Sequence, residues 1–243
     1  MAFTPALTAS EMLYEAKVLY ESIASADAPG YTNLQWSILL TRAQHNVVTR
    51  LWEEGYDKDE VHRGALSTLL TPTISTTKTD RDDIYTSSQF QAWEFTVDDD
   101  IMFTYSERCS YGNPIKYADV IPVEWDYYKM NVDNPFEQPD GTYFWGMVGS
   151  NSTPVYSKVI LVPASITPLT LYTVGIHYPL PIVINGVTLQ GVTGNSITGV
   201  GNCKLHPAIH RDIVEEAANL ASAYSKDQVG YQILQNEMNQ NNV

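Results

Sequence analysis

A long amphipathic stretch near the C-terminus constrains the fold of this chain more than any other feature. It starts around Pro207, which suits the first turn of a helix because its missing N–H has no helical partner there. Apolar residues then recur at helical spacing along one stripe: Ile209, Ile213, Ala217, Leu220, Ala221 and Tyr224. Charged residues occupy the opposite face. Such a helix must bury its stripe, and we expect it to pack on the helices at the other end of the chain.

The N-terminal part predicts three helices with short connections, which is typical of a small helical bundle. The first is opened by a capping box at residues 8–11 and ends at the turn residues 27–30. The second begins near residue 32, and the third is opened by a capping pattern at residues 57–60. The second helix carries a strong apolar stripe: Trp36, Leu39, Leu40, Ala43, Val47 and Leu51. We expect this stripe and that of the C-terminal helix to provide the packing and assembly contacts.

After Pro72 the helical period disappears, and Thr, Tyr, Val and Pro become frequent. Strands are predicted in five segments: 90–97, 101–106, 143–148, 155–162 and 169–178. Residues 98–100, three aspartates, predict a hairpin turn between the first two strands. The glycine-rich run over residues 186–201 indicates a flexible loop without a phosphate-binding pattern. A further short helix is possible over residues 229–238.

The predicted fold class is therefore α+β, with a helical bundle built from N-terminal helices and a C-terminal helix. Residues 1–72 form the N-terminal helical part, and residues 73–200 form a large β-rich insertion. Residues 201–243 supply the C-terminal helix that completes the helical domain, followed by a polar tail.

Composition excludes several classes of function. The formal net charge of −14 disfavours nonspecific nucleic-acid binding and adhesion to an anionic membrane, both of which need a basic surface. It is compatible with an acidic channel through which DNA slides without sticking. The N-terminus lacks the features of a secretory signal, and no apolar run is long enough to cross a bilayer. Two distant cysteines indicate folding in a reducing compartment.

Metal sites are weakly supported. His206 and His210 have a spacing that can hold zinc, and Glu215 could assist. Pro207 lies between them and no His-Glu-x-x-His pattern is present, so a helix-capping role for His206 is the better interpretation. Residues 98–100 lack the alternating ligands and the terminal Glu of a calcium loop. We expect neither a metal nor a cofactor.

Catalytic sites are no better supported. Four acidic residues are candidates for a glycosidase pair: Glu94, Glu107, Glu124 and Asp126. The spacing that matters in such a pair is spatial, so the sequence does not select among them. Neither Cys109 nor Cys203 has the local context of a nucleophile, and no Gly-x-Ser-x-Gly elbow is present. Aromatic residues of the middle segment suit a core, a subunit interface or sugar stacking: Trp93, Trp125, Tyr127, Tyr128 and Trp145.

Three groups of motifs together resemble one known family. The first comprises residues 39–44, 55–56, 62–63 and 69–70. The second comprises Asp126-Tyr127-Tyr128 followed by Asn134-Pro135-Phe136-Glu137-Gln138-Pro139. The third comprises Tyr172 and residues 179–182, 203–213 and 220–221. In order and spacing they are similar to the neck ring proteins of crAss-like and related tailed bacteriophages.

The resemblance implies a structural virion protein without enzymatic activity. Its subunits would form a ring, commonly of twelve copies, stacked between the portal protein and neighbouring neck or tail proteins. DNA would pass through the ring without sequence-specific binding, no membrane would be involved, and assembly would take place in the bacterial host cytoplasm. Two alternatives remain open: a tail or baseplate component outside the neck, and a carbohydrate-binding or glycan-degrading β-sandwich protein.

Overall fold

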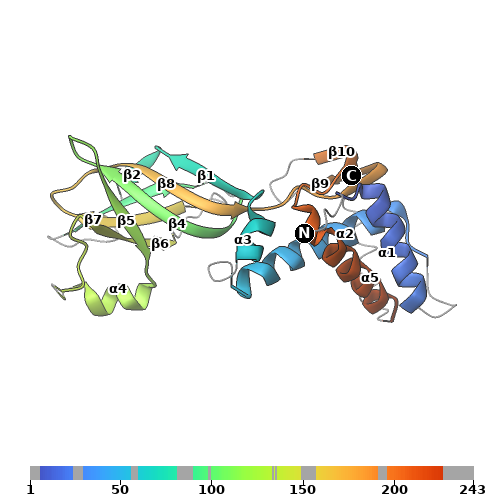
Figure 1. Cartoon of the computed structure of the whole chain (residues 1–243). Helices are drawn as coiled ribbons and strands as arrows, with labels where there is room; N and C mark the ends of the chain where they lie inside the picture. The colour runs from blue at the N-terminus through green and yellow to red at the C-terminus, as the bar shows by residue number, and fades with distance from the viewer. Residues whose placement is uncertain are drawn as a thin grey trace. The chain divides into compact units, whose positions relative to one another are not determined.

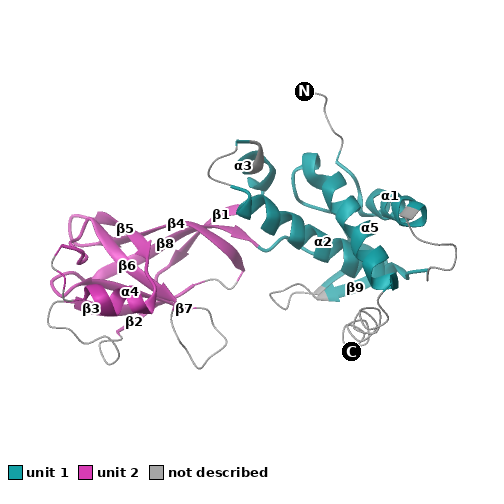
Figure 2. Ribbon diagram, turned by 90° about the horizontal axis from the view of Figure 1, so that it is seen from below, with its two compact units in different colours: residues 1–69, 178–243 teal, residues 70–177 magenta. Residues whose placement is uncertain are grey.

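The computed structural model has the expected α+β architecture, in which helices come from both ends of the chain and the middle of the chain forms a large sheet (Figure 1). It describes residues 6–23, 30–55, 60–80, 90–97, 100–132, 134, 136–148, 157–190 and 196–226. The chain divides into a helical unit, residues 1–69 and 178–243, and a sheet unit, residues 70–177 (Figure 2). The predicted stop at residues 27–29, the cap at 57–59 and the helix at 229–238 lie outside the described residues.

The helical unit joins elements from the two ends of the chain. They are α1 (Ala9–Ile23), α2 (Asn33–Glu53), α3 (Glu60–Leu66), β9 (Val183–Gln190), β10 (Ser196–Gly201), the 3-10 turn η1 (Pro207–Ile209) and α5 (His210–Lys226). Helix α5 packs against both α1 and α2, as its apolar stripe predicts (Figure 1). The N-terminal helices and the C-terminal helix therefore share one core.

The capping box predicted at residues 8–11 is confirmed, and a second one, not predicted, opens α2. The Thr8 backbone N–H donates to Oε2 of Glu11 at 2.8 Å, and the Glu11 N–H donates back to Thr8 Oγ1 at 3.3 Å. Thr32 and Gln35 form the same reciprocal pair at the start of α2. Because the first turn of a helix leaves backbone N–H groups unpaired, these side chains fix where each helix begins.

The predicted stripes line the core of the helical unit, with two partial exceptions, Leu220 and Tyr224, which are half-buried. Most of their members are buried: Trp36, Leu39, Leu40, Ala43, Val47, Ile209, Ile213 and Ala217. Leu220 is only half-buried, because α5 turns its most buried face slightly toward Val214 and Ala218. The hydroxyl of Tyr31 reaches across from the start of α2 and donates to the Ala221 carbonyl at 2.7 Å.

The glycine-rich run forms a hairpin, β9–β10, where a flexible loop was expected, and this hairpin belongs to the helical unit. The sheet unit therefore ends at residue 177. The sequence pattern predicts that the β-rich insertion ends at residue 200. Gly186 and Gly199 adopt positive φ angles of 86° and 100°, and the pairing register shifts between Gly199 and Gly201. These irregularities interrupt the period-2 pattern, which is why the strands are hidden in the sequence.

A polar stripe on α2 holds the backbone that leads into β9. The Ile184 N–H donates to Ser37 Oγ at 3.0 Å, and the Ile182 N–H donates to Thr41 Oγ1 at 3.1 Å. One turn further on, Gln44 Nε2 donates to the Leu180 carbonyl at 3.2 Å. Spacings of four and three residues place these side chains on one face, so α2 satisfies a strand edge that would otherwise lack partners.

The sheet unit is built from one sheet of eight strands with the order β1-β8-β4-β5-β6-β7-β3-β2. The strands are β1 (Leu70–Ser75), β2 (Lys78–Asp80), β3 (Phe90–Thr96), β4 (Ile101–Tyr111), β5 (Lys116–Pro122), β6 (Tyr143–Val148), β7 (Ser157–Pro163) and β8 (Pro168–His177). A short helix, α4 (Trp125–Asn131), lies between β5 and β6 in the chain. The described strands of this unit form one sheet, and not the two sheets of a sandwich.

Alternation along the strands gives the sheet two apolar faces. On one face, Phe95, Phe144, Ile160 and Leu171 belong to a single buried cluster contributed by β3 through β8. Their neighbours on the other face join Tyr128 of α4 in a second cluster: Ala92, Trp145, Met147, Val159 and Leu161. The period of two follows from the pleat of the strands, so α4 covers the outer face of a curled sheet.

The predicted hairpin between residues 90–97 and 101–106 is wrong. β3 pairs with β2 and β7, whereas β4 pairs with β5 and β8. Phe95 and Cys109 nevertheless belong to the same core cluster. β3 and β4 therefore belong to the same sheet and share a core cluster, but they are not neighbouring strands. Asp98 and Asp99 themselves lie outside the described residues.

A half-buried histidine, His45, should make the helical unit sensitive to acid. His45 on α2 packs edge-on against Tyr178, with ring centroids 5.9 Å apart. Burial lowers the pKa of His45, and a hydrogen bond to the Pro179 carbonyl only partly opposes this. The unfolded chain therefore takes up this proton more readily than the folded chain. The free energy of unfolding should therefore decrease as the pH drops through the ordinary histidine pKa of 6.5, toward the lower pKa of the folded state.

We expect the urea midpoint of the native chain to decrease between about pH 7 and pH 5.5. His45→Gln should flatten this part of the profile, because glutamine does not titrate. If the urea midpoints of the native chain and of His45→Gln decreased equally over this pH range, a group other than His45 would cause the effect.

Candidate interaction sites

The two histidines with a spacing that can hold zinc both form hydrogen bonds to the backbone. His206 caps η1, with its Nδ1 accepting the Ala208 N–H at 3.2 Å, as the capping interpretation expects. His210 is 1% exposed, and its Nδ1 accepts the Leu7 N–H at 3.0 Å while its Nε2 lies 3.0 Å from the Leu205 carbonyl. Among the described residues there is no group of three or more potential ligands. Both histidines therefore organise the start of the C-terminal helix.

His210 also helps to join the two ends of the chain. The Leu7 N–H that it binds lies just before α1, and the Ala9 N–H donates to Asn202 Oδ1 at 2.9 Å. Two side chains from the C-terminal region thus satisfy backbone donors at the start of the N-terminal helix. The helical unit is closed by directed bonds as well as by apolar packing.

The two buried acidic candidates, Glu94 and Glu107, each bond to a different partner. Glu94 is buried and accepts a hydrogen bond from Ser157 Oγ at 2.5 Å. Glu107 is buried in an ion pair with Lys158 and lies 3.5 Å from Thr173 Oγ1. Glu124 and Asp126 are exposed at the start of α4. The two buried carboxylates are thus committed to structural bonds.

Both cysteines are buried free thiols. Burial raises the pKa of Cys109 to about 12 and that of Cys203 to about 11. Because the thiolate is the reactive form, both side chains are inert at neutral pH. No helix of the described chain has the length and apolar character to span a membrane.

The first concave surface is a groove between α1 and α5 on the helical unit. Its volume is about 280 Å³. It is lined by Tyr14, Glu15, Val18, Leu19, Arg211, Val214 and Glu215. Tyr14 is 70% exposed although it is a large aromatic residue. Tyr14 and Val18 are four residues apart and off the buried stripe of α1, a spacing that could have revealed this surface in the sequence.

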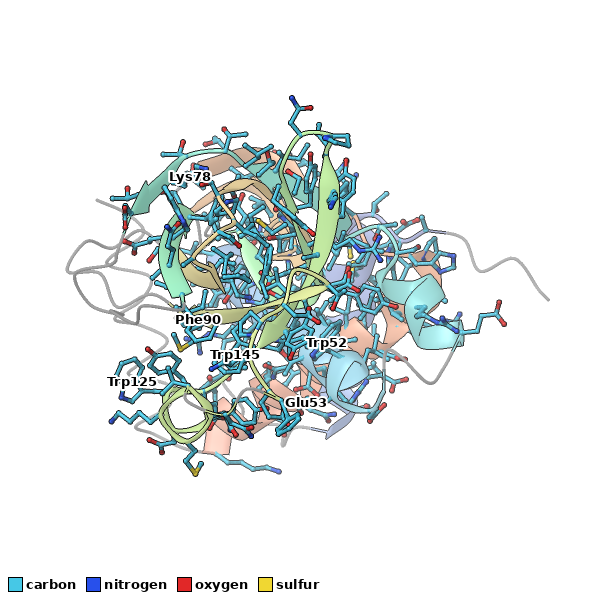
Figure 3. The ribbon with its side chains drawn as sticks, turned by 90° about the vertical axis from the view of Figure 1, so that its left-hand side faces the viewer. Trp52, Glu53, Lys78, Phe90, Trp125 and Trp145 are labelled. Atoms are coloured by element: carbon cyan, nitrogen blue, oxygen red, sulfur yellow. The ribbon has the colours of Figure 1, made fainter. Side chains whose placement is uncertain are left out.

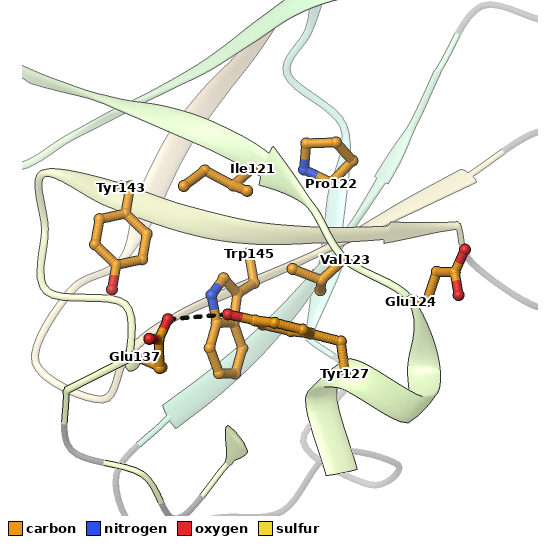
Figure 4. A pocket seen from close by; sticks show the side chains of 8 residues that line it. All are labelled: Ile121, Pro122, Val123, Glu124, Tyr127, Glu137, Tyr143 and Trp145. Carbon is orange, nitrogen blue, oxygen red and sulfur yellow. Dashed lines mark hydrogen bonds between the residues drawn. The ribbon is translucent and has the colours of Figure 1, made fainter. Parts of the chain in front are cut away.

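The second concave surface is a pocket of about 640 Å³ on the sheet unit (Figure 4). It is lined by Ile121, Pro122, Val123, Glu124, Tyr127, Glu137, Tyr143 and Trp145. The Tyr127 hydroxyl donates to Glu137 Oε2 at 2.9 Å. This bond joins α4 to the segment that follows it, and fixes the Glu137 carboxylate at one end of the pocket.

An aromatic cluster forms the wall beneath this pocket. Trp145 of β6 stacks with Phe90 of β3 at 6.2 Å and meets the rings of Tyr127 and Tyr128 edge-on at 5.9 and 6.3 Å. Trp125 stacks on Tyr128 with ring centroids 5.3 Å apart. Figure 3 labels Trp125, Trp145 and Phe90. Four aromatic residues named from the sequence are thus brought together, whereas Trp93 lies under the ammonium of Lys78 instead.

The two ionisable side chains that line the pocket, other than its tyrosines, are the carboxylates of Glu124 and Glu137. The hydrogen bond to Glu137 is the main cause that raises the pKa of Tyr127. Burial, followed by the charges of Asp140 and Glu137, raises the pKa of Tyr143. Raised tyrosine pKa values mean that a further negative charge is disfavoured here. Sequence reasoning missed Glu137 and Tyr143, because only folding brings them beside α4.

Comparison with known proteins gives a consistent result. A family model described as phage tail ring protein 3/4 matches residues 7–232. A relative named ring protein 4/5, from Bacteroides phage crAss001, is 24% identical over 227 residues. This alignment covers 89% of the chain and 93% of the relative. The family match therefore includes both the helical unit and the sheet unit.

Proposed function

Because this chain belongs to the phage tail ring protein 3/4 family, and is therefore a structural virion protein, we propose that it forms a closed ring in the head-to-tail connector. Twelve copies would surround the DNA channel between the portal protein and the neighbouring neck or tail proteins. The ring would be assembled in the cytoplasm of the bacterial host and would have no catalytic role.

The groove between α1 and α5 is the observation that carries this proposal. A single subunit leaves Tyr14 and Val18 exposed beside Leu19 and Val214 in this groove. Exposed apolar patches on a soluble protein commonly mark interaction surfaces. A head-to-tail contact made by each copy with the next closes into a ring when the rotation between copies divides a full turn.

The charge of the chain suits a channel for DNA. With a net charge of −14, each of twelve proposed copies would add to a negative field around the axis. Phosphates would be repelled from the wall, so DNA would pass without being retained. A tail or baseplate ring would share these properties, and its position in the virion separates it from a neck ring.

The groove predicts how the ring can be broken. Tyr14→Asp places a charge in the proposed subunit contact and should convert rings into monomers, with the fold retained because Tyr14 is exposed. Ser10→Asp adds the same charge to an exposed position of α1 outside the groove and should leave the rings intact. Sedimentation velocity and electron microscopy of the purified proteins measure both.

If Tyr14→Asp formed rings indistinguishable from those of the native chain, the groove would not be part of the subunit contact. A native chain that remains monomeric at every concentration, and is missing from purified virions, would contradict the ring itself.

A further inference from the structure

We propose that the pocket beside α4 binds an arginine side chain of a neighbouring virion protein, with the guanidinium against Tyr127 and beside Glu137. This inference rests on the proposed function, because a ring in a stack must meet a different protein above or below it. The lining of the pocket carries the argument, through its shape and its charge.

The shape of the pocket provides an aromatic corner with a rigid base. Trp145 is 2% exposed and forms the base, whereas Tyr127 is 38% exposed and offers part of its ring. The two rings meet at 79°, and the Tyr127 hydroxyl is held by Glu137 (Figure 4). Because both ends of the Tyr127 side chain are fixed, its ring is already placed to receive a flat cation.

The charge of the pocket selects a cation. Glu124 and Glu137 lie at opposite ends, and the described residues that line the pocket include no basic side chain (Figure 4). Tyr127 binds Oε2 of Glu137, which leaves Oε1 as the acceptor for a guanidinium. The hydrogen bond to Glu137 is the main cause that raises the pKa of Tyr127, and burial is the main cause for Tyr143, with the negative charges of Glu137 and Asp140 adding smaller contributions.

Arginine fits these features better than lysine or a sugar. Its guanidinium is planar, stacks on aromatic rings and donates to a carboxylate in the same plane. An ammonium ion has no plane to stack and is more strongly hydrated. A sugar needs an open aromatic platform, and the most buried ring of the pocket, Trp145, does not present one.

The probe is the peptide acetyl-Gly-Arg-Gly-amide, with the citrulline peptide as a neutral control of nearly the same shape. Binding to the full-length chain is followed by saturation-transfer NMR, which tolerates large assemblies. We expect the arginine peptide to bind and the citrulline peptide to bind about tenfold more weakly. Glu137→Gln should weaken arginine binding by about the same factor.

Asp126→Asn is the matched control, because it removes one negative charge from α4 outside the pocket lining. It should preserve binding within about twofold. Equal binding of the two peptides, equal losses in the two variants, or no arginine binding would each overturn the proposal. Preferential binding of oligosaccharides would also overturn it, in favour of a glycan site. Ring formation is measured separately, so rings without arginine binding would refute this pocket alone.

Discussion

Replacing Ile213 by Asp should unfold the helical unit. Ile213 is fully buried on α5, and α5 packs against both α1 and α2. A carboxylate at this position would lie among apolar side chains, at a cost of about 4 kcal/mol. We expect loss of helical circular dichroism or a large decrease in the urea midpoint, together with loss of ring assembly.

Two further substitutions on the same helix calibrate this result. Leu220→Asp should cost about half as much, because Leu220 is only half-buried. Asn219→Asp adds the same charge at an exposed position and should change stability by less than about 0.5 kcal/mol. If all three variants were equally stable, the buried face of α5 would be assigned incorrectly.

Replacing Lys158 by Met should destabilise the sheet unit by about 3–5 kcal/mol. Lys158 and Glu107 form an ion pair whose side chains are 8% and 3% exposed. Removing the ammonium leaves the Glu107 carboxylate buried without its cation, and the weak bond from Thr173 does not replace it. Urea unfolding followed by tryptophan fluorescence measures the loss.

The control for Lys158→Met is an exposed ion pair between the neighbouring strands β4 and β5. Arg108 and Asp119 lie 2.7 Å apart with about two thirds of each side chain exposed. Asp119→Asn should therefore cost less than about 1 kcal/mol. The double variant Glu107→Leu with Lys158→Met should recover most of the stability, because it leaves no buried charge. A double variant as unstable as Lys158→Met would show that shape, and not charge, limits the site.

The helical unit could largely be predicted because its signals are local. The cap at Thr8 and stripes of period 3.6 depend on residues close together in the chain, so they identify α1, α2 and α5 directly. The pairing of the two ends followed from the need to bury both stripes. The hairpin β9–β10 was missed because glycines with positive φ interrupt its pattern.

Of the eight described strands of the sheet unit, the sequence predicts five, which are β3, β4, β6, β7 and β8. It predicts neither the order of the strands nor the other three, β1, β2 and β5. Segments such as β3 and β6 carry clear β-prone sequences, yet strand pairing depends on contacts distant in the chain. Parallel pairing of β5 with β6 requires a connection between them, which runs through α4. No local sequence motif predicted this helix. The core cluster joining β3 to β4 across the curled sheet is likewise a property of the whole fold.

The candidate surfaces, too, could be predicted only in part from the sequence. The aromatic residues of the pocket were singled out from the sequence, and Trp125, Tyr127, Tyr128 and Trp145 lie together as a cluster. Glu137 joins them only through a bond to Tyr127 that depends on the turn after α4. His206 and His210 have a spacing that suits a metal site. In the structure His206 caps η1, and His210 accepts a hydrogen bond from the Leu7 backbone near the N-terminus.

A reconstruction of the intact virion at side-chain resolution tests the ring proposal most directly. It should show copies of this chain closed around the DNA axis next to the portal, with Tyr14 and Val18 buried between adjacent subunits. Copies that do not encircle the axis, or that leave the groove between α1 and α5 open to solvent throughout the particle, would contradict it.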